Sequence, residues 1–202
     1  MLILASASPR RRELLTQAGL AFSVESADLN EDLLPGEAAA AYVQRLAEEK
    51  AHAVWTRHKA VDTASDPLFV LGADTCVVCD GRVLGKPIDA TDARRMLKLL
   101  AGRTHAVLTG IALVSRVGAV RAVEITQVSF NMVTDAEIAQ YVVSGEPMDK
   151  AGAYAIQGYA ARWIPRIEGC YFNVMGLPIA RTVALLAEAR AAIESAAAIK
   201  TT

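Results

Sequence analysis

The feature that most constrains the fold is an unbroken apolar run at residues 68–73, which is followed directly by a carboxylate, Asp74. A continuous apolar run of this length is typical of a strand that is buried on both faces of its sheet. Burial on both faces requires helices on both sides, as in α/β folds. The run therefore predicts a central strand with Asp74 at its carboxyl end, where open α/β sheets commonly bind ligands.

Helix and strand signals surround this run. Ser8 before Pro9 is typical of a helix start, Thr134 with Glu137 forms a capping box, and Asp80-Gly81 predicts a tight hairpin. The expected strands are residues 2–5, 22–25, 68–74, 104–115, 119–133 and 162–167, and the expected helices are residues 9–18, 37–58, 89–102, 134–145 and the stretch from 178 onward. This order predicts an α/β fold with a mixed sheet. The alanine-rich end, residues 196–202, is expected to fray.

The composition favours one globular domain, residues 1–202. Of the 202 residues, 53% are hydrophobic and 21% are charged, which is enough to bury a substantial core. The net charge of -1 gives no overall field that would attract nucleic acid or an anionic membrane. No apolar run reaches the roughly 18 residues of a membrane span, and no signal-type segment begins the chain. We therefore expect a cytoplasmic protein without nucleic-acid or membrane partners.

The three cysteines agree with a reducing compartment, because they do not form a disulfide framework. Cys76 and Cys79 form a C-x-x-C pair, but they lie in a strand-like stretch where residues three apart point to opposite faces. Cys170 is the third cysteine and leaves no matching pair, so we expect no zinc site.

The basic turn Ser8-Pro9-Arg10-Arg11-Arg12 is unusual for a helix start. Three cations there oppose the helix dipole, at a cost of about a few tenths of a kcal/mol each. A bound anion would reverse that sign. The N–H groups of the first turn, the Ser8 hydroxyl and the guanidinium groups together suit a phosphate. The alternative is an ordinary solvated basic turn.

Lys50 lies on the apolar side of the helix expected over residues 37–58. The apolar stripe of this helix consists of Val43, Leu46, Ala47 and Val54, at spacings of three and four. A lysine on that stripe must either extend to solvent or meet an anion, and a substrate phosphate would satisfy it. The alternative is a lysine at the stripe edge whose amine reaches water.

Asp74 and Gln157 are the remaining candidates from pattern alone. A carboxylate at the position of Asp74, which Thr75 follows, can hold Mg²⁺ or act as general base on a water, and phosphoryl chemistry needs both. The alternative is an aspartate that caps a turn. Gln157 lies in a segment of small and apolar residues bracketed by glycines, and its amide suits the O4 and N3–H edge of uracil or thymine. On its own, this match is weak evidence.

Five short blocks occur in order along the chain: LASASPRR (residues 4–11), LGADT (71–75), GKP (85–87), DKAGAYAIQG (149–158) and GLP (176–178). Together they resemble the Maf family of nucleotide pyrophosphatases, the septum formation inhibitor-like proteins, over residues 1 to about 190. The resemblance implies an α/β fold like that of inosine triphosphate pyrophosphatase. Such a fold has an elongated mixed sheet flanked by helices, and two lobes with a central cleft.

The resemblance also implies an enzyme that hydrolyses nucleoside triphosphates to the monophosphate and pyrophosphate. Asp74 matches the family's catalytic carboxylate in its G-[AS]-D motif. Arg11, Thr75 and Gln157 match positions that mark the branch preferring dTTP and UTP. Cys170 departs from the pattern, because relatives commonly carry a small hydroxyl residue there.

The two lines of reasoning combine into one hypothesis for the site. The substrate-binding residues are Ser8, Arg10, Arg11, Lys50, Thr75, Lys86 and Gln157. Glu31 and Asp74 hold a divalent metal cation, Mg²⁺ or Mn²⁺. Asp74, or a water that it orients, attacks the α-phosphorus in line with the departing pyrophosphate.

Two other functions stay open at this point. The chain is alternatively a pyrophosphatase for modified or purine nucleotides such as 7-methyl-GTP, with base choice set elsewhere in the pocket. It is alternatively a non-enzymatic inhibitor of septum formation that acts by binding a partner, although this leaves the basic turn, Lys50 and Asp74 without a joint purpose. The resemblance also implies a homodimer.

Overall fold

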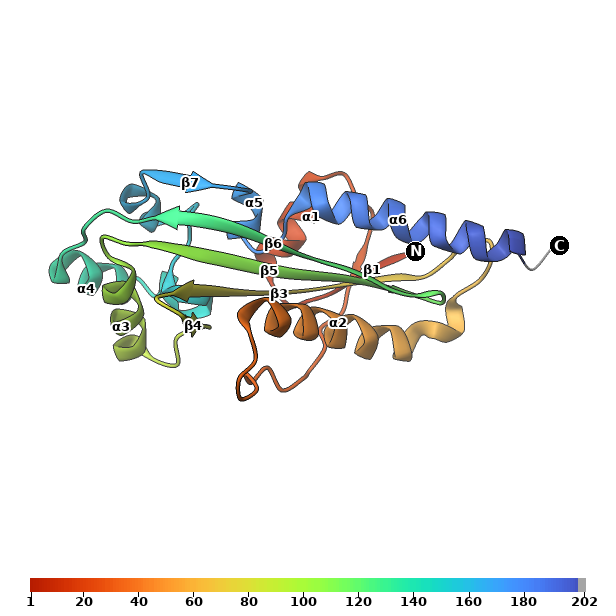
Figure 1. Cartoon of the computed structure of the whole chain (residues 1–202), viewed down its shortest axis with the longest axis horizontal. Helices are drawn as coiled ribbons and strands as arrows, with labels where there is room; N and C mark the ends of the chain where they lie inside the picture. The colour runs from red at the N-terminus through yellow and green to blue at the C-terminus, as the bar shows by residue number, and fades with distance from the viewer. Residues whose placement is uncertain (200–202) are drawn as a thin grey trace. The chain divides into compact units, whose positions relative to one another are not determined.

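The computed structural model describes residues 1–199 (Figure 1). The strands are β1 (Leu2–Ala5), β2 (Ser23–Val24), β3 (Phe69–Cys79), β4 (Arg82–Leu84), β5 (Thr104–Ser115), β6 (Gly118–Ser129) and β7 (Arg166–Glu168). The α-helices are α1 (Pro9–Gln17), α2 (Ala39–His58), α3 (Ala90–Leu100), α4 (Asp135–Val143), α5 (Tyr171–Val174) and α6 (Ile179–Ile199). Short 3₁₀ helices are η1 (Lys59–Val61), η2 (Glu146–Asp149), η3 (Ala151–Ala153) and η4 (Tyr159–Trp163).

The strands of the described residues form one mixed sheet, as the sequence predicts. Its order is β2-β1-β3-β5-β6-β7, and β4 pairs with β3. β1 is parallel to both β2 and β3, whereas β4 is antiparallel to β3 and β7 is antiparallel to β6. Helices flank the sheet, so the predicted α/β class is confirmed. No helix among residues 1–199 is long and apolar enough to cross a membrane.

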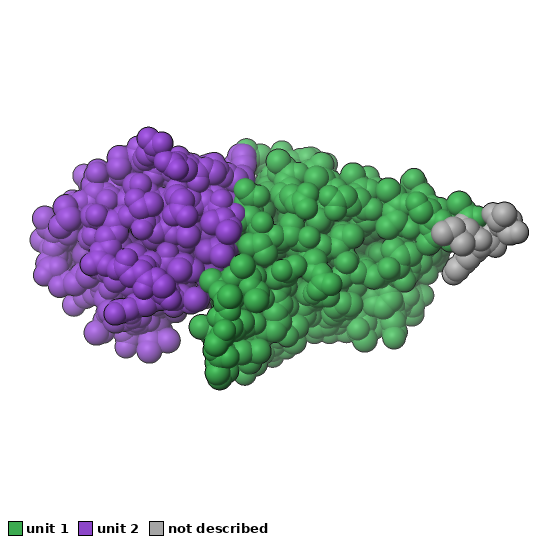
Figure 2. Space-filling model, viewed as in Figure 1, with its two compact units in different colours: residues 1–74, 109–124, 176–202 green, residues 75–108, 125–175 purple. Residues whose placement is uncertain are grey.

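The chain divides into two compact units, coloured separately in Figure 2. Unit 1 consists of residues 1–74, 109–124 and 176–202, and unit 2 consists of residues 75–108 and 125–175. The last three residues assigned to unit 1, which also end the predicted domain, lie outside the described part of the chain. The predicted cleft stays a prediction.

In unit 1, α2 packs on the sheet at two glycines. A Cβ on Gly72 would lie 2.0 Å from the carbonyl oxygen of Ala47, and a Cβ on Gly110 would lie 2.3 Å from that of Val43. Only hydrogen fits at these two positions, so the glycines set how closely the helix approaches β3 and β5. Figure 1 shows α6 on the other side of these strands from α2. Both faces are therefore covered, as the apolar run predicts.

In unit 2, a buried aromatic cluster forms the core beside α3 and α4, which pack against each other. The cluster contains His105, Phe130, Tyr141, Tyr154, Tyr159 and Trp163. The predicted capping box of α4 is present, with Thr134 and Glu137 bonding each other's backbone. The predicted hairpin is also present, because Asp80 and Gly81 both have positive φ and connect paired residues of β3 and β4.

Several sequence predictions are wrong in their boundaries. The strand expected over residues 119–133 ends at Ser129. β3 does not end at Asp74 but continues to Cys79, because pairing with β4 extends it. The strand expected over residues 162–167 begins only at Arg166, since η4 occupies the preceding residues. α6 continues through Ile199 instead of fraying from residue 196, and the rest of that stretch, residues 200–202, lies outside the described residues.

Candidate active site

Lys50 of α2 lies between two carboxylates in unit 1. Its Nζ atom is 2.6 Å from Asp74 Oδ1 and 2.6 Å from Glu31 Oε1. The side chains of Lys50 and Asp74 are buried, with 8% and 10% of their surface exposed, whereas that of Glu31 is 43% exposed. The sequence prediction that Lys50 points inward is confirmed. Its neighbours in the structure are carboxylates, so its predicted contact with phosphate stays a prediction.

The sheet register explains why Asp74 faces Lys50. Side chains alternate along a strand, so Asp74 shares a face of β3 with Gly72, the residue on which α2 packs. Ala5, the last residue of β1, pairs with Gly72. Asp74 therefore lies just beyond the end of the parallel partner strand, although its own strand continues. The prediction that Asp74 lies at the carboxyl end of its own strand is therefore wrong, and the strand end next to Asp74 is that of β1.

Glu31 reaches Lys50 from the irregular segment between β2 and α2. Two residues of α2 hold this segment through its backbone: Tyr42 Oη donates to the Glu31 carbonyl at 2.9 Å, and Arg45 donates to the Asp32 carbonyl at 3.1 Å. Arg45 also bonds both carboxylate oxygens of Glu37, at 2.7 and 2.8 Å. This guanidinium lowers the pKa of Glu37. The carboxylate of Glu31 is thus presented by a segment fastened to the helix that carries Lys50.

In the basic turn at the start of α1, the neighbouring residues Arg10 and Arg11 differ in burial. The Ser8 hydroxyl accepts from the Arg11 backbone N–H at 3.5 Å, as the predicted helix cap. The Arg11 side chain is buried and donates to the carbonyls of Ala73 and Gly176, each at 2.8 Å. Burial lowers the pKa of the Arg11 guanidinium, and the Asp74 carboxylate opposes that shift. Arg11 therefore fixes the backbone next to Asp74, whereas Arg10 is partly exposed.

The other predicted substrate-binding residues belong to unit 2. Thr75 follows Asp74 directly in β3 and is partly buried. Lys86 and Gln157 are exposed, in the segments after β4 and after η3. The structure thus brings Ser8, Arg11, Glu31, Lys50 and Asp74 together within unit 1. The joint action of Lys86 and Gln157 with that group stays a prediction.

The carboxylates of Glu31 and Asp74 suit a hard divalent cation in chemistry. Among residues 1–199, no group of three or more His, Cys, Asp or Glu side chains is arranged to hold a metal. Mg²⁺ typically binds through one or two carboxylates together with waters and substrate phosphates. Glu31 and Asp74 supply two carboxylates, the number in that pattern, and in this structure both contact the Lys50 ammonium.

The sequence reasoning missed the residues that hold the site segments. Tyr42 and Arg45 hold the Glu31 segment, and in unit 2 Tyr141 and Glu146 hold the segment around Gln157. Two signals were present: Arg45 has Glu49 four residues on, and Glu146 lies three residues before the start of the block that contains Gln157. Neither signal identifies the distant backbone groups that these side chains bind.

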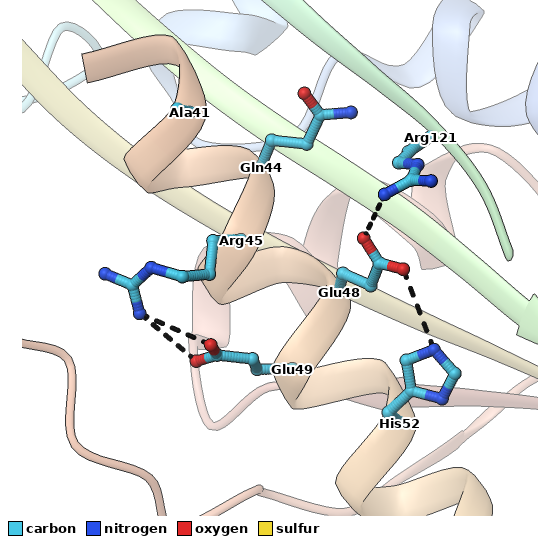
Figure 3. A pocket seen from close by; sticks show the side chains of 7 residues that line it. All are labelled: Ala41, Gln44, Arg45, Glu48, Glu49, His52 and Arg121. Carbon is cyan, nitrogen blue, oxygen red and sulfur yellow. Dashed lines mark hydrogen bonds and ion pairs between the residues drawn. The ribbon is translucent and has the colours of Figure 1, made fainter. Parts of the chain in front are cut away.

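A surface groove of about 470 Å³ between α2 and β6 is a different feature (Figure 3). In this groove Arg121 pairs with Glu48 at 2.6 Å and Arg45 pairs with Glu49 at 3.3 Å. A triphosphate entering it would meet two glutamates whose charges already balance the arginines. The groove is lined by none of the predicted catalytic, metal-binding or substrate-binding residues, so we do not assign it to catalysis.

Comparison with known proteins supplies a family and named relatives. A family model described as Maf-like protein matches residues 1–189. A protein of Hahella chejuensis is 50% identical over 187 residues, which cover 93% of this chain and 91% of that protein. Proteins of Geobacter sp. (strain M21) and Koribacter versatilis are 52% and 50% identical, over 90% and 93% of this chain and 92% and 94% of their own lengths. All three relatives carry the name dTTP/UTP pyrophosphatase.

Proposed function

The chain belongs to the Maf-like protein family, and on that premise we propose that it is a nucleoside triphosphate pyrophosphatase acting on dTTP and UTP. Water and the triphosphate are consumed, and dTMP or UMP is released with pyrophosphate. The observation that carries the proposal is the buried Lys50–Asp74 pair with Glu31 beside it, in a family whose compared members are named for this reaction.

We assign the attack on the α-phosphorus to a water oriented by Asp74, or to Asp74 itself. In the first case the bond between the α-phosphorus and the bridging oxygen breaks as the water oxygen bonds to phosphorus, and Asp74 takes the proton of the water. In the second case the same bond breaks as the Asp74 carboxylate bonds to phosphorus, and water then cleaves the acyl phosphate, which releases the monophosphate and restores Asp74. Arg11 keeps the strand backbone beside Asp74 in place.

We assign phosphate binding to cationic side chains and to the start of α1. Lys50 would donate to the phosphates, together with Arg10, Arg11 and Lys86 and the hydroxyl of Ser8. Glu31 and Asp74 would hold Mg²⁺ or Mn²⁺, which when bound neutralises charge that develops on the pyrophosphate. Because Arg11 already donates to two carbonyls, we expect Arg10 to supply the larger share of the charge that reaches the phosphates.

We assign base recognition to Thr75 and Gln157. The exposed amide of Gln157 offers one donor and one acceptor group, which match the O4 and N3–H of a uracil or thymine ring. We further propose that residues 1–202 act as one domain, because the family match extends across segments of both units. A cytosolic location and a homodimer belong to the same proposal, and fractionation and sedimentation test them.

The proposal is tested by pyrophosphate release from dTTP, UTP, CTP, GTP, ITP and 7-methyl-GTP, each with Mg²⁺ and with Mn²⁺. Wild type and Asp74→Asn are assayed side by side. We expect selective hydrolysis of dTTP and UTP, lost in the variant. Hydrolysis of the purine nucleotides alone would refute the assignment of Thr75 and Gln157. An absence of hydrolysis with every nucleotide would favour a protein that acts by binding.

A further inference from the structure

We propose that Tyr141 and Glu146 are positioning residues that hold the segment around Gln157 in the conformation in which Gln157 recognises the base. This inference rests on the proposed function and deepens it. It assigns base selectivity partly to two side chains that touch neither the phosphates nor the base. The segment concerned is residues 155–159, referred to below as the Gln157 loop, and all of it belongs to unit 2.

The first step is that one hydrogen-bonded pair holds both ends of the loop. Tyr141 Oη accepts from the backbone N–H of Ala155 at 3.2 Å, and Glu146 Oε1 accepts from that of Tyr159 at 3.2 Å. The two side chains also bond each other, because Tyr141 Oη donates to Glu146 Oε1 at 2.9 Å. Displacing either side chain therefore releases a backbone group at an end of the loop.

The second step is that the loop is shaped to receive Glu146. A Cβ at Gly158 would lie 2.0 Å from Glu146 Oε1, so a side chain there would displace the carboxylate. The φ angle of Gly158 is -102°, so the positive-φ region is not what favours a glycine here, and the constraint that the structure shows is the space taken by the Glu146 carboxylate. The backbone N–H of Gly158 also bonds the Ala155 carbonyl at 3.1 Å, which closes a turn with Gln157 inside it.

The third step is that the pair itself has little freedom. Tyr141 is 1% exposed, and its ring stacks on Tyr159 and meets the edge of Trp163, with ring centroids 5.5 and 5.2 Å apart. Burial raises the pKa of the Tyr141 phenol, and its bond to Glu146 adds to the shift, so the proton that it donates stays in place. Gln157, in contrast, is exposed. The buried Tyr141 thus supports a loop whose Gln157 side chain is accessible to a base.

The consequence is a separation between selectivity and turnover. Loosening the loop disorders the amide of Gln157, while the residues assigned to the phosphates and to the attack are unchanged. A hydrogen bond to the base that is lost or misplaced weakens discrimination by about tenfold. The change is expected in the KM for UTP more than in kcat, because Gln157 has no role in the step at phosphorus.

The test compares UTP with CTP, which present a carbonyl and an amino group at the same ring position. Tyr141→Phe removes only the hydroxyl that holds Ala155 and is expected to lower the UTP/CTP ratio of kcat/KM about tenfold. Tyr159→Phe is the matched control, because its hydroxyl accepts from exposed Arg162 at 2.7 Å and its ring stays in the stack. The control should keep the wild-type ratio.

A double variant decides whether Tyr141 acts through Gln157. Gln157→Ala should lower the ratio, and adding Tyr141→Phe to it should change the ratio no further. An unchanged ratio in Tyr141→Phe, an unchanged ratio in Gln157→Ala, or an independent further loss in the double variant would each overturn the inference. If Tyr141→Phe does not fold, Glu146→Ala and its conservative partner Glu146→Gln replace it, with loss of the ratio expected in the first and rescue in the second. A wild type that hydrolyses neither UTP nor dTTP would refute the proposed function itself, an outcome that no variant is needed to recognise.

Discussion

Two regions of the molecule are held in place in different ways: the Lys50 cluster of unit 1, which consists of Lys50, Asp74 and Glu31, and the Gln157 loop of unit 2. In the cluster, the groups assigned to chemistry hold one another: Lys50 contacts Asp74 and Glu31 directly. In the loop, the residue assigned to recognition is exposed, and other residues hold its backbone. Changes in the cluster should therefore lower turnover with every nucleotide, whereas changes in the loop should alter the choice between nucleotides.

The two regions also differ in the kind of interaction that fixes them. The cluster depends on charge, and one of its carboxylates is almost half exposed on a segment fastened by Tyr42 and Arg45. The loop depends on hydrogen bonds inside a stack of aromatic rings. The contact of Glu31 is near solvent and is screened, whereas the buried Lys50–Asp74 pair and the buried hydrogen bonds of the loop are costly to break. The predictions below use this contrast.

The largest expected effect is the loss of turnover in Asp74→Asn. The amide can neither take a proton from water nor carry charge to a cation, so kcat should fall at least about a hundredfold for every nucleotide. Steady-state pyrophosphate release measures it. Gln157→Ala is the contrasting variant and should change the ratio between nucleotides. A variant Asp74→Asn with wild-type kcat would remove Asp74 from the mechanism.

Lys50→Met should lower the free energy of unfolding by about 3 kcal/mol, because it leaves Asp74 as a buried charge without its ammonium partner. Urea denaturation at pH 7 measures the loss. Asp74→Asn should cost less, since Lys50 keeps Glu31 as a partner. The double variant Lys50→Met/Asp74→Asn should recover much of the loss, because neither charge is left alone. If the two losses simply add, the pair does not stabilise the fold as described.

Residue patterns predicted those parts of the site that depend on local periodicity. The apolar stripe of α2 turned Lys50 inward, and the apolar run of β3 required helices on both faces; both expectations are confirmed. The partner of Lys50 was not predictable in the same way. Asp74 lies 24 residues away, and only the register of α2 on Gly72 brings the two together.

The wrong and missing predictions have one cause, because each depends on contacts with another part of the chain. The end of β3 was misplaced because its continuation depends on pairing with β4, which no pattern inside the run reports. Tyr141 and Glu146 were overlooked because they bind backbone groups 14 and 13 residues away. Backbone N–H groups have no residue-specific signal in a sequence, so the side chains that hold a loop are harder to predict than the side chain that the loop presents.

The aromatic core of unit 2 should also make stability depend on pH. His105 is 2% exposed, and burial lowers its pKa to about 4 from the ordinary value of 6.5. An unfolded chain binds a proton at His105 near pH 6.5, whereas the folded chain does so only near pH 4. The contribution to stability is therefore complete above pH 6.5 and declines as the pH falls toward 4. Between pH 7 and pH 5 the loss should reach about 2 kcal/mol.

The control for this prediction is His105→Gln, which does not titrate and keeps a polar group near Tyr154 Oη, now 2.8 Å from His105 Nε2. Urea denaturation at several pH values compares the two chains. The variant should lose about 2 kcal/mol less between pH 7 and pH 5 than the wild type does. Parallel curves for both chains would mean that groups other than His105 cause the acid sensitivity.

The last comparison makes the same chemical change in both regions, and the change in the Glu31 segment should have the smallest effect of all. Tyr141→Phe leaves the buried N–H of Ala155 without its acceptor and should lower the free energy of unfolding by about 1 to 3 kcal/mol. Tyr42→Phe removes a donor from the Glu31 carbonyl at a site that water can reach, and should cost about 0.5 kcal/mol or less. Denaturation of both variants under one condition gives the difference. If Tyr42→Phe were the more destabilising, the Glu31 segment would be as firmly built into the fold as the Gln157 loop, and the contrast between a self-supporting charged cluster and a separately supported loop would fail.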